Sequence, residues 1–286
     1  MWGMASTRDR YMLLLLASAS AGCAVGLSSN QPAHVAKPGQ LHAEIGVDVS
    51  YPTGTAQEVI DAADSVEEAV RQQQQMPSDA QKRVIFEGGA AIAMNPPAAV
   101  PHLGVDYGVA EKWEVGARLA TSGWRLSARR QLLTQEAHGI DLSAGLGAGR
   151  ALLTPPVQRV FESLEVSDFW RWNVDLPVAL GRHGSWYRVW GGPRLLYSWV
   201  SQTMTLTLDD LGTAEPVRAS GKFSGRGLYA GAYAGAALGY RSLFIGPELT
   251  LVYLFGSADV DSLGSRQNVA VESLVVYPAF AVMGEF

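Results

Sequence analysis

The sequence predicts an all-β fold: a transmembrane, antiparallel, up-and-down β-barrel of about 10 strands, with one amphipathic helix in its first long loop. Three observations support this prediction. Apolar and polar residues alternate with period two in one segment after another. The connections between these segments are alternately short and long. Charged residues make up only 17% of the chain, and 31 of its 286 residues are glycine. Eight or twelve strands are the alternatives to ten.

The composition excludes several other classes of protein. An apolar content of 48% excludes a disordered polar chain. The net charge of −5 and a pI of about 5.6 argue against nucleic acid as a partner. No run of 18 or more consecutive apolar residues occurs, which excludes ordinary membrane-spanning helices. Strands with one face in lipid average to intermediate hydropathy, so a barrel is compatible with this composition.

Residues 1–22 have the form of an export signal, in which arginines precede a short apolar stretch that ends in small residues. The segment resembles a bacterial lipoprotein signal. The resemblance implies cleavage before Cys23, which would then carry a lipid. The alternative is a conventional signal peptide that is discarded together with this thiol. With lipidation, residues 23–39 form a flexible periplasmic spacer between the lipid anchor and a barrel at 40–286.

Ten segments alternate as strands with one apolar and one polar face do. In the first, the apolar residues Leu41, Ile45 and Val47 alternate with polar or small ones. Many of the segments reach the 9–11 residues, approximately, that a tilted strand needs to cross a bilayer. The ten segments are 41–51, 102–107, 113–119, 124–129, 140–149, 170–180, 187–199, 227–239, 243–253 and 274–286.

The connections between the segments divide into two kinds. Short periplasmic turns and longer extracellular loops are typical of outer-membrane barrels, and an even strand number places both chain ends in the periplasm. The connection 120–123 is an exception, because it is short where a long loop is expected. Short turns are expected at 109–112, 134–139, 181–186 and 240–242, and long loops at 52–100, 150–168, 200–223 and 255–270.

The polar faces of the segments carry acids and arginines but no lysine. Lysine usually faces solvent, whereas arginine is favoured in enclosed pairs with carboxylates. The polar faces are therefore expected to point inward and form a luminal charge network. Its expected members are Glu44, Asp48, Asp106, Glu114, Arg118, Arg125, Arg129, Asp141, Arg171, Asp175, Arg188, Arg194 and Glu248.

The apolar faces carry large aromatic residues near the ends of the segments. Such residues form girdles at the two interfaces of a membrane. The alternative is a soluble, lipid-anchored sandwich in which these aromatics fill the core. The residues concerned are Tyr51, Tyr107, Trp113, Trp124, Trp170, Tyr197, Trp199 and Tyr253.

The C-terminal segment alternates through Phe280 and Val282 and ends on Phe286. It resembles the last strand of bacterial outer-membrane proteins, whose closing aromatic belongs to the signal that the barrel assembly machinery reads. Residues 107–119 resemble the tight periplasmic hairpin of small outer-membrane barrels. Over residues 40–286, the resemblance implies the outer membrane of a Gram-negative bacterium, with membrane lipid and the assembly machinery as partners. It implies neither conduction nor catalysis.

The first long loop contains the one expected helix, over residues 56–75. Thr55 and Glu58 form a capping box, and apolar residues follow at spacings of three and four. We favour packing of this helix on the neighbouring loop. It could instead cap the barrel mouth, insert as a plug or bind an unknown partner. The apolar segment 84–94 could add a strand that lies on the loop.

The sequence shows no constellation for catalysis, metal or cofactor binding. The five histidines lack metal-ligand spacing, and a single cysteine excludes a cysteine-based zinc site. His102 shares the inferred luminal face with Asp106, and His183 lies beside Ser185, but neither accompanies a nucleophile elbow. We therefore expect no catalytic residues, no metal and no cofactor.

The expected lumen is narrow or closed, because eight strands already enclose a space that side chains fill and the charge network adds bulk. A structural or interaction role at the cell envelope is therefore favoured. One alternative is a small-solute pore, with Arg188 and Arg194 across from Glu248 at a constriction. A less favoured alternative is a membrane-embedded, lipid-modifying enzyme.

Overall fold

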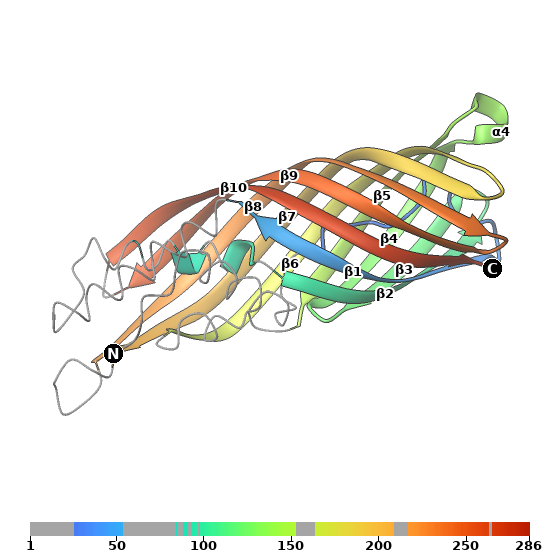
Figure 1. Cartoon of the computed structure of the whole chain (residues 1–286). Helices are drawn as coiled ribbons and strands as arrows, with labels where there is room; N and C mark the ends of the chain where they lie inside the picture. Colours follow the sequence, from blue (N-terminus) through green and yellow to red (C-terminus); the bar gives the residue numbers. More distant parts are fainter. Residues whose placement is uncertain are drawn as a thin grey trace, which may run out of the picture.

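The computed structural model describes residues 26–53, 84, 88–90, 93–96, 98–152, 164–208, 217–262 and 265–286. In this part of the chain, ten strands form one closed barrel (Figure 1). Each strand pairs with its neighbours in sequence, and β1 (Leu41–Pro52) pairs antiparallel with β10 (Ser265–Glu285) to close the barrel. The predicted ten-strand, up-and-down barrel is confirmed. The other strands are β2 (Ala98–Ala110), β3 (Trp113–Ala120), β4 (Gly123–Leu133), β5 (Asp141–Ala151), β6 (Leu164–His183), β7 (Tyr187–Leu208), β8 (Val217–Tyr240) and β9 (Leu243–Ser262).

The barrel has two unlike ends. At the first, which we call the turn end, short turns join β2 to β3, β4 to β5, β6 to β7 and β8 to β9. The short helix α4 (Gln135–His138) lies in one of these turns (Figure 1). Leu41 and Phe286 also lie at this end, where each backbone N–H donates to the carbonyl of the other at 2.8 Å. At the opposite end, which we call the loop end, a two-residue turn joins β3 to β4.

Strands β6 to β10 have 20–24 residues, whereas β1 to β5 have 8–13. The long strands run on past the loop end of β1 to β4 (Figure 1). The expected loops at 200–223 and 255–270 are therefore largely strand, which corrects the sequence prediction. The reason is an inverted pattern: Ala258 and Val260 are buried inside, while Asp261 is exposed and Asp259 is only partly covered. Beyond the exposed apolar belt the apolar face points inward, so the pattern with an outward apolar face ends before the strand does.

The outer surface of the barrel is apolar along the middle of the strands. Ile45 is 62% exposed and Leu119 is 60% exposed, and neighbouring strands present further leucine and valine side chains. Exposed apolar area on this scale marks a surface that lipid or another protein covers. The aromatics predicted to form girdles include side chains that are exposed on this surface, which excludes the soluble sandwich with an aromatic core. These exposed side chains are Tyr51, Tyr107, Trp113, Trp170, Trp199 and Tyr253.

The exposed aromatics mark two levels of the barrel. Tyr107, Trp113 and Tyr240 lie near the turn end, while Tyr51 and Tyr253 lie toward the loop end. On β9, Tyr253 lies ten positions after the turn-end residue Leu243. At about 3.3 Å per residue and a tilt of about 40°, this segment spans roughly 25 Å, the height of the apolar band of an outer-membrane barrel.

Helical structure is sparse among the described residues. Residues 88–90 and 93–94 form helical turns, so the strand suggested for 84–94 is wrong in its described part. These turns lie inside the barrel, where Ala90, Ala93 and Met94 are buried. No helix in the described part of the chain has the length and apolar character needed to cross a membrane. The expected helix 56–75 and Cys23 fall outside the described residues.

Candidate functional site

Residues 26–36, which we call the plug, run inside the barrel. Leu27 and Ala36 are fully buried, and the chain leaves the lumen at the turn end, where Gly39 N donates to Gly108 O at 2.9 Å. The sequence predicted a flexible periplasmic spacer over this segment, and that prediction is wrong for its described part. The spacer-like composition of Ser, Asn and Gln supplies hydrogen-bonding groups, and the polar inner wall supplies their partners.

Glu248 on β9 holds the middle of the plug. Its carboxylate accepts hydrogen bonds from Ser29 N at 2.7 Å, Ser29 Oγ at 3.0 Å and Asn30 N at 2.9 Å. Trp190 Nε1 donates to the same carboxylate at 2.8 Å. Asn30 has a φ of 46°, in the left-handed region that asparagine tolerates better than most residues. These donors satisfy a buried carboxylate that would otherwise be costly in the lumen.

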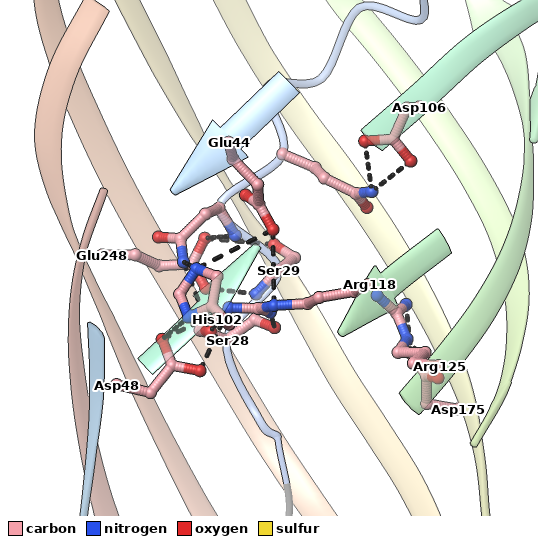
Figure 2. A network of polar contacts seen from close by, with 12 residues as sticks. Ser28, Ser29, Glu44, Asp48, His102, Asp106, Arg118, Arg125, Asp175 and Glu248 are labelled. Carbon is pink, nitrogen blue, oxygen red and sulfur yellow. Dashed lines mark hydrogen bonds and ion pairs between the residues drawn. The ribbon is translucent and has the colours of Figure 1, made fainter. Parts of the chain in front are cut away.

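Arg118 on β3 connects the plug to β1, the strand on the other side of β2 (Figure 2). Its guanidinium donates to Ser28 O at 2.7 Å and to Ser28 Oγ at 2.9 Å. The same group forms ion pairs with Asp48 at 3.1 Å and Glu44 at 3.3 Å, both on β1. His102 Nδ1 lies 3.4 Å from Asp48 Oδ1, between the two carboxylates of β1. One arginine therefore compensates two buried acids and fixes the plug backbone.

The part of the plug nearer the turn end, from Gln31 to Ala36, is held by β2, β3 and β4. Gln31 Nε2 donates to both oxygens of Asp106, at 2.9 and 3.0 Å. Ala36 N donates to Glu114 Oε2 at 2.7 Å, and the other oxygen of Glu114 accepts from Arg129 Nε at 2.6 Å. Both oxygens of Asp106 thus accept from the plug, whereas Glu114 accepts from the plug with one oxygen and from the wall with the other. The luminal charges consequently position a segment of this chain.

A further ion-pair group lies on β4, β6 and β7. Asp175 accepts from Arg125 Nε at 2.9 Å and Nη2 at 2.7 Å, and from Arg194 Nη1 at 2.9 Å. Gly147 faces this group, and a Cβ atom at its position would collide with Asp175. A cavity of about 60 Å³ lies beside it, lined in part by Gly26 of the plug. Little free space accompanies the ion pairs in this part of the lumen.

The loop-end half of the lumen is apolar. The helical turn at 93–94 packs there, and its backbone is anchored by side chains of the wall: Tyr229 OH donates to Met94 O at 2.6 Å, and Arg171 Nη2 donates to the same carbonyl at 2.8 Å. The buried residues of this cluster come mainly from β7 to β10. They include Leu27, Met94, Leu196, Val200, Met204, Phe223, Val252, Leu254, Val260, Val271, Val275 and Tyr277.

The structure places all predicted members of the luminal charge network on the inner side, and all except the half-buried Arg125 are buried. It does not form the constriction expected of a pore. Arg188 pairs with Glu285 at 2.6 Å, whereas Arg194 pairs with Asp175. Glu248 contacts the plug instead of either arginine. The predicted C-terminal residues Phe280, Val282 and Phe286 point outward and are exposed.

Three histidines meet at the mouth of the turn end, which the sequence did not indicate. His34 comes from the plug, His42 from β1 and His183 from the end of β6. The ring centroids of His34 lie 5.5 Å from His42 and 4.7 Å from His183. His183 Nδ1 lies 2.6 Å from Asp141 Oδ2. Their separation along the chain left no local spacing that could have revealed the cluster, and only the position of the plug brings it together.

Comparisons with known proteins concern the fold alone. No protein-family model matches the sequence, and no curated protein matches it. Solved structures that match include Ail, the attachment invasion locus protein of Yersinia pestis, with 10% identity, 87% of this chain and 99% of that chain covered, and a TM-score of 0.27. The CymD monoaromatic hydrocarbon channel matches with 11% identity, 87% and 89% coverage, and a TM-score of 0.31. The N-terminal β-barrel domain of Pseudomonas aeruginosa OprF matches with 8% identity and a TM-score of 0.17, and the match covers 86% of this chain and 97% of that chain. Similarity at this level carries no conclusion about function.

Proposed function

We propose that the protein is an outer-membrane β-barrel sealed by its own N-terminal segment, with a structural or interaction role at the cell envelope and no catalytic role. The observation that carries this proposal is the plug, whose backbone is bound by Glu248, Arg118 and Glu114 from different strands. In this proposal, the plug and the apolar cluster leave no continuous path for solute through the described part of the lumen. The long strands of the loop end provide a surface for contacts outside the membrane.

The exposed apolar belt and its two aromatic levels support the membrane location. In this proposal the turn end faces the periplasm, because short turns face that side in outer-membrane barrels. Phe286 and the point where the plug leaves the barrel then lie in the periplasm. The outward-facing Phe280, Val282 and Phe286 are positioned for the assembly machinery to bind during insertion. Lipidation of Cys23 stays a prediction that mass spectrometry of the mature protein tests.

Conductance in a planar lipid bilayer tests the sealed barrel. Wild-type protein is expected to leave the current at the level of bare lipid. A variant that lacks residues 26–36 and 93–96 is expected to conduct, because the polar half and the apolar half of the lumen each lose a chain segment that fills them. Heat-modifiable migration on a gel shows whether each variant has folded. The control is Glu165→Ala, which removes an exposed acid of β6. Open channels in the wild type, or a folded deletion variant without conductance, would contradict the proposal.

A second candidate is a small-solute pore that opens when the plug moves. It is supported by a cavity of about 490 Å³ at the turn-end mouth, lined by polar residues such as Gln131, Glu136 and Arg188. The pore requires the plug to leave its partners, so Glu248→Ala should raise the frequency of openings. If Glu248→Ala and the wild type are equally silent while the deletion variant conducts, the sealed barrel is supported over the pore.

A further inference from the structure

The turn-end mouth brings together three imidazoles and two carboxylates. His34 Nε2 lies 3.2 Å from Glu285 Oε1. The ligating atoms of His34, His42 and Glu285 all lie within 4.8 Å of one another, and the same holds for His34, Asp141 and His183. His34 belongs to both groups. The plug therefore contributes the residue that is common to the two groups of ligands.

We propose that this cluster binds a divalent transition metal ion of the zinc type, with His34 as the shared ligand. The barrel supplies the remaining ligands, from His42 and Glu285 on one side or from Asp141 and His183 on the other. Neutral imidazole together with carboxylate oxygen is a ligand set that zinc uses widely. The site is additional to the sealing role, and it holds whether or not the barrel conducts.

The charges at the mouth favour the Asp141 side. Glu285 already has a cation, because Arg188 donates to both of its oxygens at 2.8 and 2.6 Å. Asp141, in contrast, is surrounded by His183, Gln135 N at 2.9 Å and Gln131 Nε2 at 3.3 Å. None of these described partners carries a permanent positive charge. A bound cation would compensate this buried carboxylate, which is 2% exposed.

The geometry requires only a local contraction. Zinc–nitrogen bonds of about 2.0–2.1 Å place tetrahedral ligands roughly 3.3 Å apart. Ligand atoms that lie up to 4.8 Å apart must therefore approach by up to about 1.5 Å when the ion binds. The cavity of about 490 Å³ that these residues line gives the ion and its waters access from solution. Binding would fix His34, and with it the plug, to the wall of the barrel.

The experiment titrates the purified, folded barrel in detergent with Co²⁺, a coloured substitute for Zn²⁺. The visible absorption of Co²⁺ bound by nitrogen ligands is expected to appear and to disappear when Zn²⁺ is added. His34→Ala should weaken binding by at least about 100-fold, since it removes the shared ligand. Asp141→Asn should weaken binding by about 10- to 100-fold, the usual effect of losing a carboxylate that ligates the metal or orients a ligand.

The matched control is His138→Ala, which removes an exposed histidine of α4 at the same end of the barrel. It should bind Co²⁺ as the wild type does. His42→Ala and His183→Ala then identify which wall completes the site. The proposal is overturned if the wild type binds no Co²⁺ or Zn²⁺ at millimolar concentration, or if folded His34→Ala keeps the wild-type affinity. Because no conductance is measured, failure of this proposal leaves the sealed barrel untouched.

Discussion

The two halves of the lumen are filled by different chemistry. Toward the turn end, ion pairs and directed hydrogen bonds hold the plug at named atoms, as Glu248 holds the amides of Ser29 and Asn30. Toward the loop end, Phe223, Leu254 and their neighbours pack as an apolar core. Directional bonds specify where a segment lies, whereas apolar burial stabilises without specifying direction. The polar half therefore sets the position of the plug, and the apolar half supplies free energy of folding.

The largest expected effect comes from Arg118→Ala in the polar half. The substitution leaves Glu44 and Asp48 buried without their arginine, which should lower the free energy of unfolding by about 3–5 kcal/mol. Denaturant unfolding followed by tryptophan fluorescence measures this change. Arg182→Ala, which removes an exposed arginine of β6, is the control. A loss no larger than that of the control would show that the network does not depend on Arg118.

The apolar half should respond to Leu254→Ala with a loss of about 2–3 kcal/mol, because a buried side chain leaves a cavity. Leu249→Ala, on the exposed outer side of the same strand, should cost less because it opens no cavity. Hydrogen exchange distinguishes the two halves: Arg118→Ala should speed exchange at the amides of Ser29 and Asn30, and Leu254→Ala should not. Equal acceleration in both variants would remove the distinction between positioning and packing.

Tyr229→Phe tests the point where polar and apolar contacts meet. It removes the hydrogen bond from Tyr229 OH to Met94 O but keeps the ring in the cluster. A loss of about 1 kcal/mol in the same unfolding measurement is expected. A loss as large as that of Leu254→Ala would mean that this hydrogen bond, and not the apolar packing, holds the helical turn.

The smallest effect is expected on the exposed extension of the strands. Arg266 and Asp259 form an ion pair of 2.7 Å, but the Arg266 side chain is 71% exposed. Solvent and salt screen such pairs, so Arg266→Ala should leave the unfolding midpoint unchanged within error. A clear shift that disappears at high salt would show that the extension contributes to stability through charge.

The barrel and its inward charges were predictable because period two reports which face a strand buries. Residues such as Glu114 and Asp175 alternate with lipid-facing apolar neighbours, and the structure places both inside. The sequence could also indicate that arginine, and not lysine, would face the acids. Which acid meets which arginine was not predictable, since the pairing depends on strand tilt and register, as the separate partners of Arg188 and Arg194 show.

The plug was not predictable for a different reason. It has no periodicity, and its partners lie far along the chain: Ser29 and Glu248 are 219 residues apart. Its polar composition matches that of an exposed spacer. Only the polar inner wall of the barrel, which the sequence of this segment does not report, makes it a plug instead of a spacer. The strand extensions were missed because their apolar face points inward at Ala258 and Val260, opposite to the pattern in the membrane. The histidine cluster depends on both the plug and the closed barrel.

The position of the plug also sets an order of events during biogenesis. The plug precedes β1 in the chain, while the seam that closes the barrel joins β1 to β10, the last strand. Once this seam has formed, residues 26–36 can reach their partners only by threading into the closed lumen through one of its ends. An open sheet presents Glu248, Arg118 and Glu114 without that obstacle. The chain segment that is made early is therefore expected to dock before the final row of hydrogen bonds closes around it.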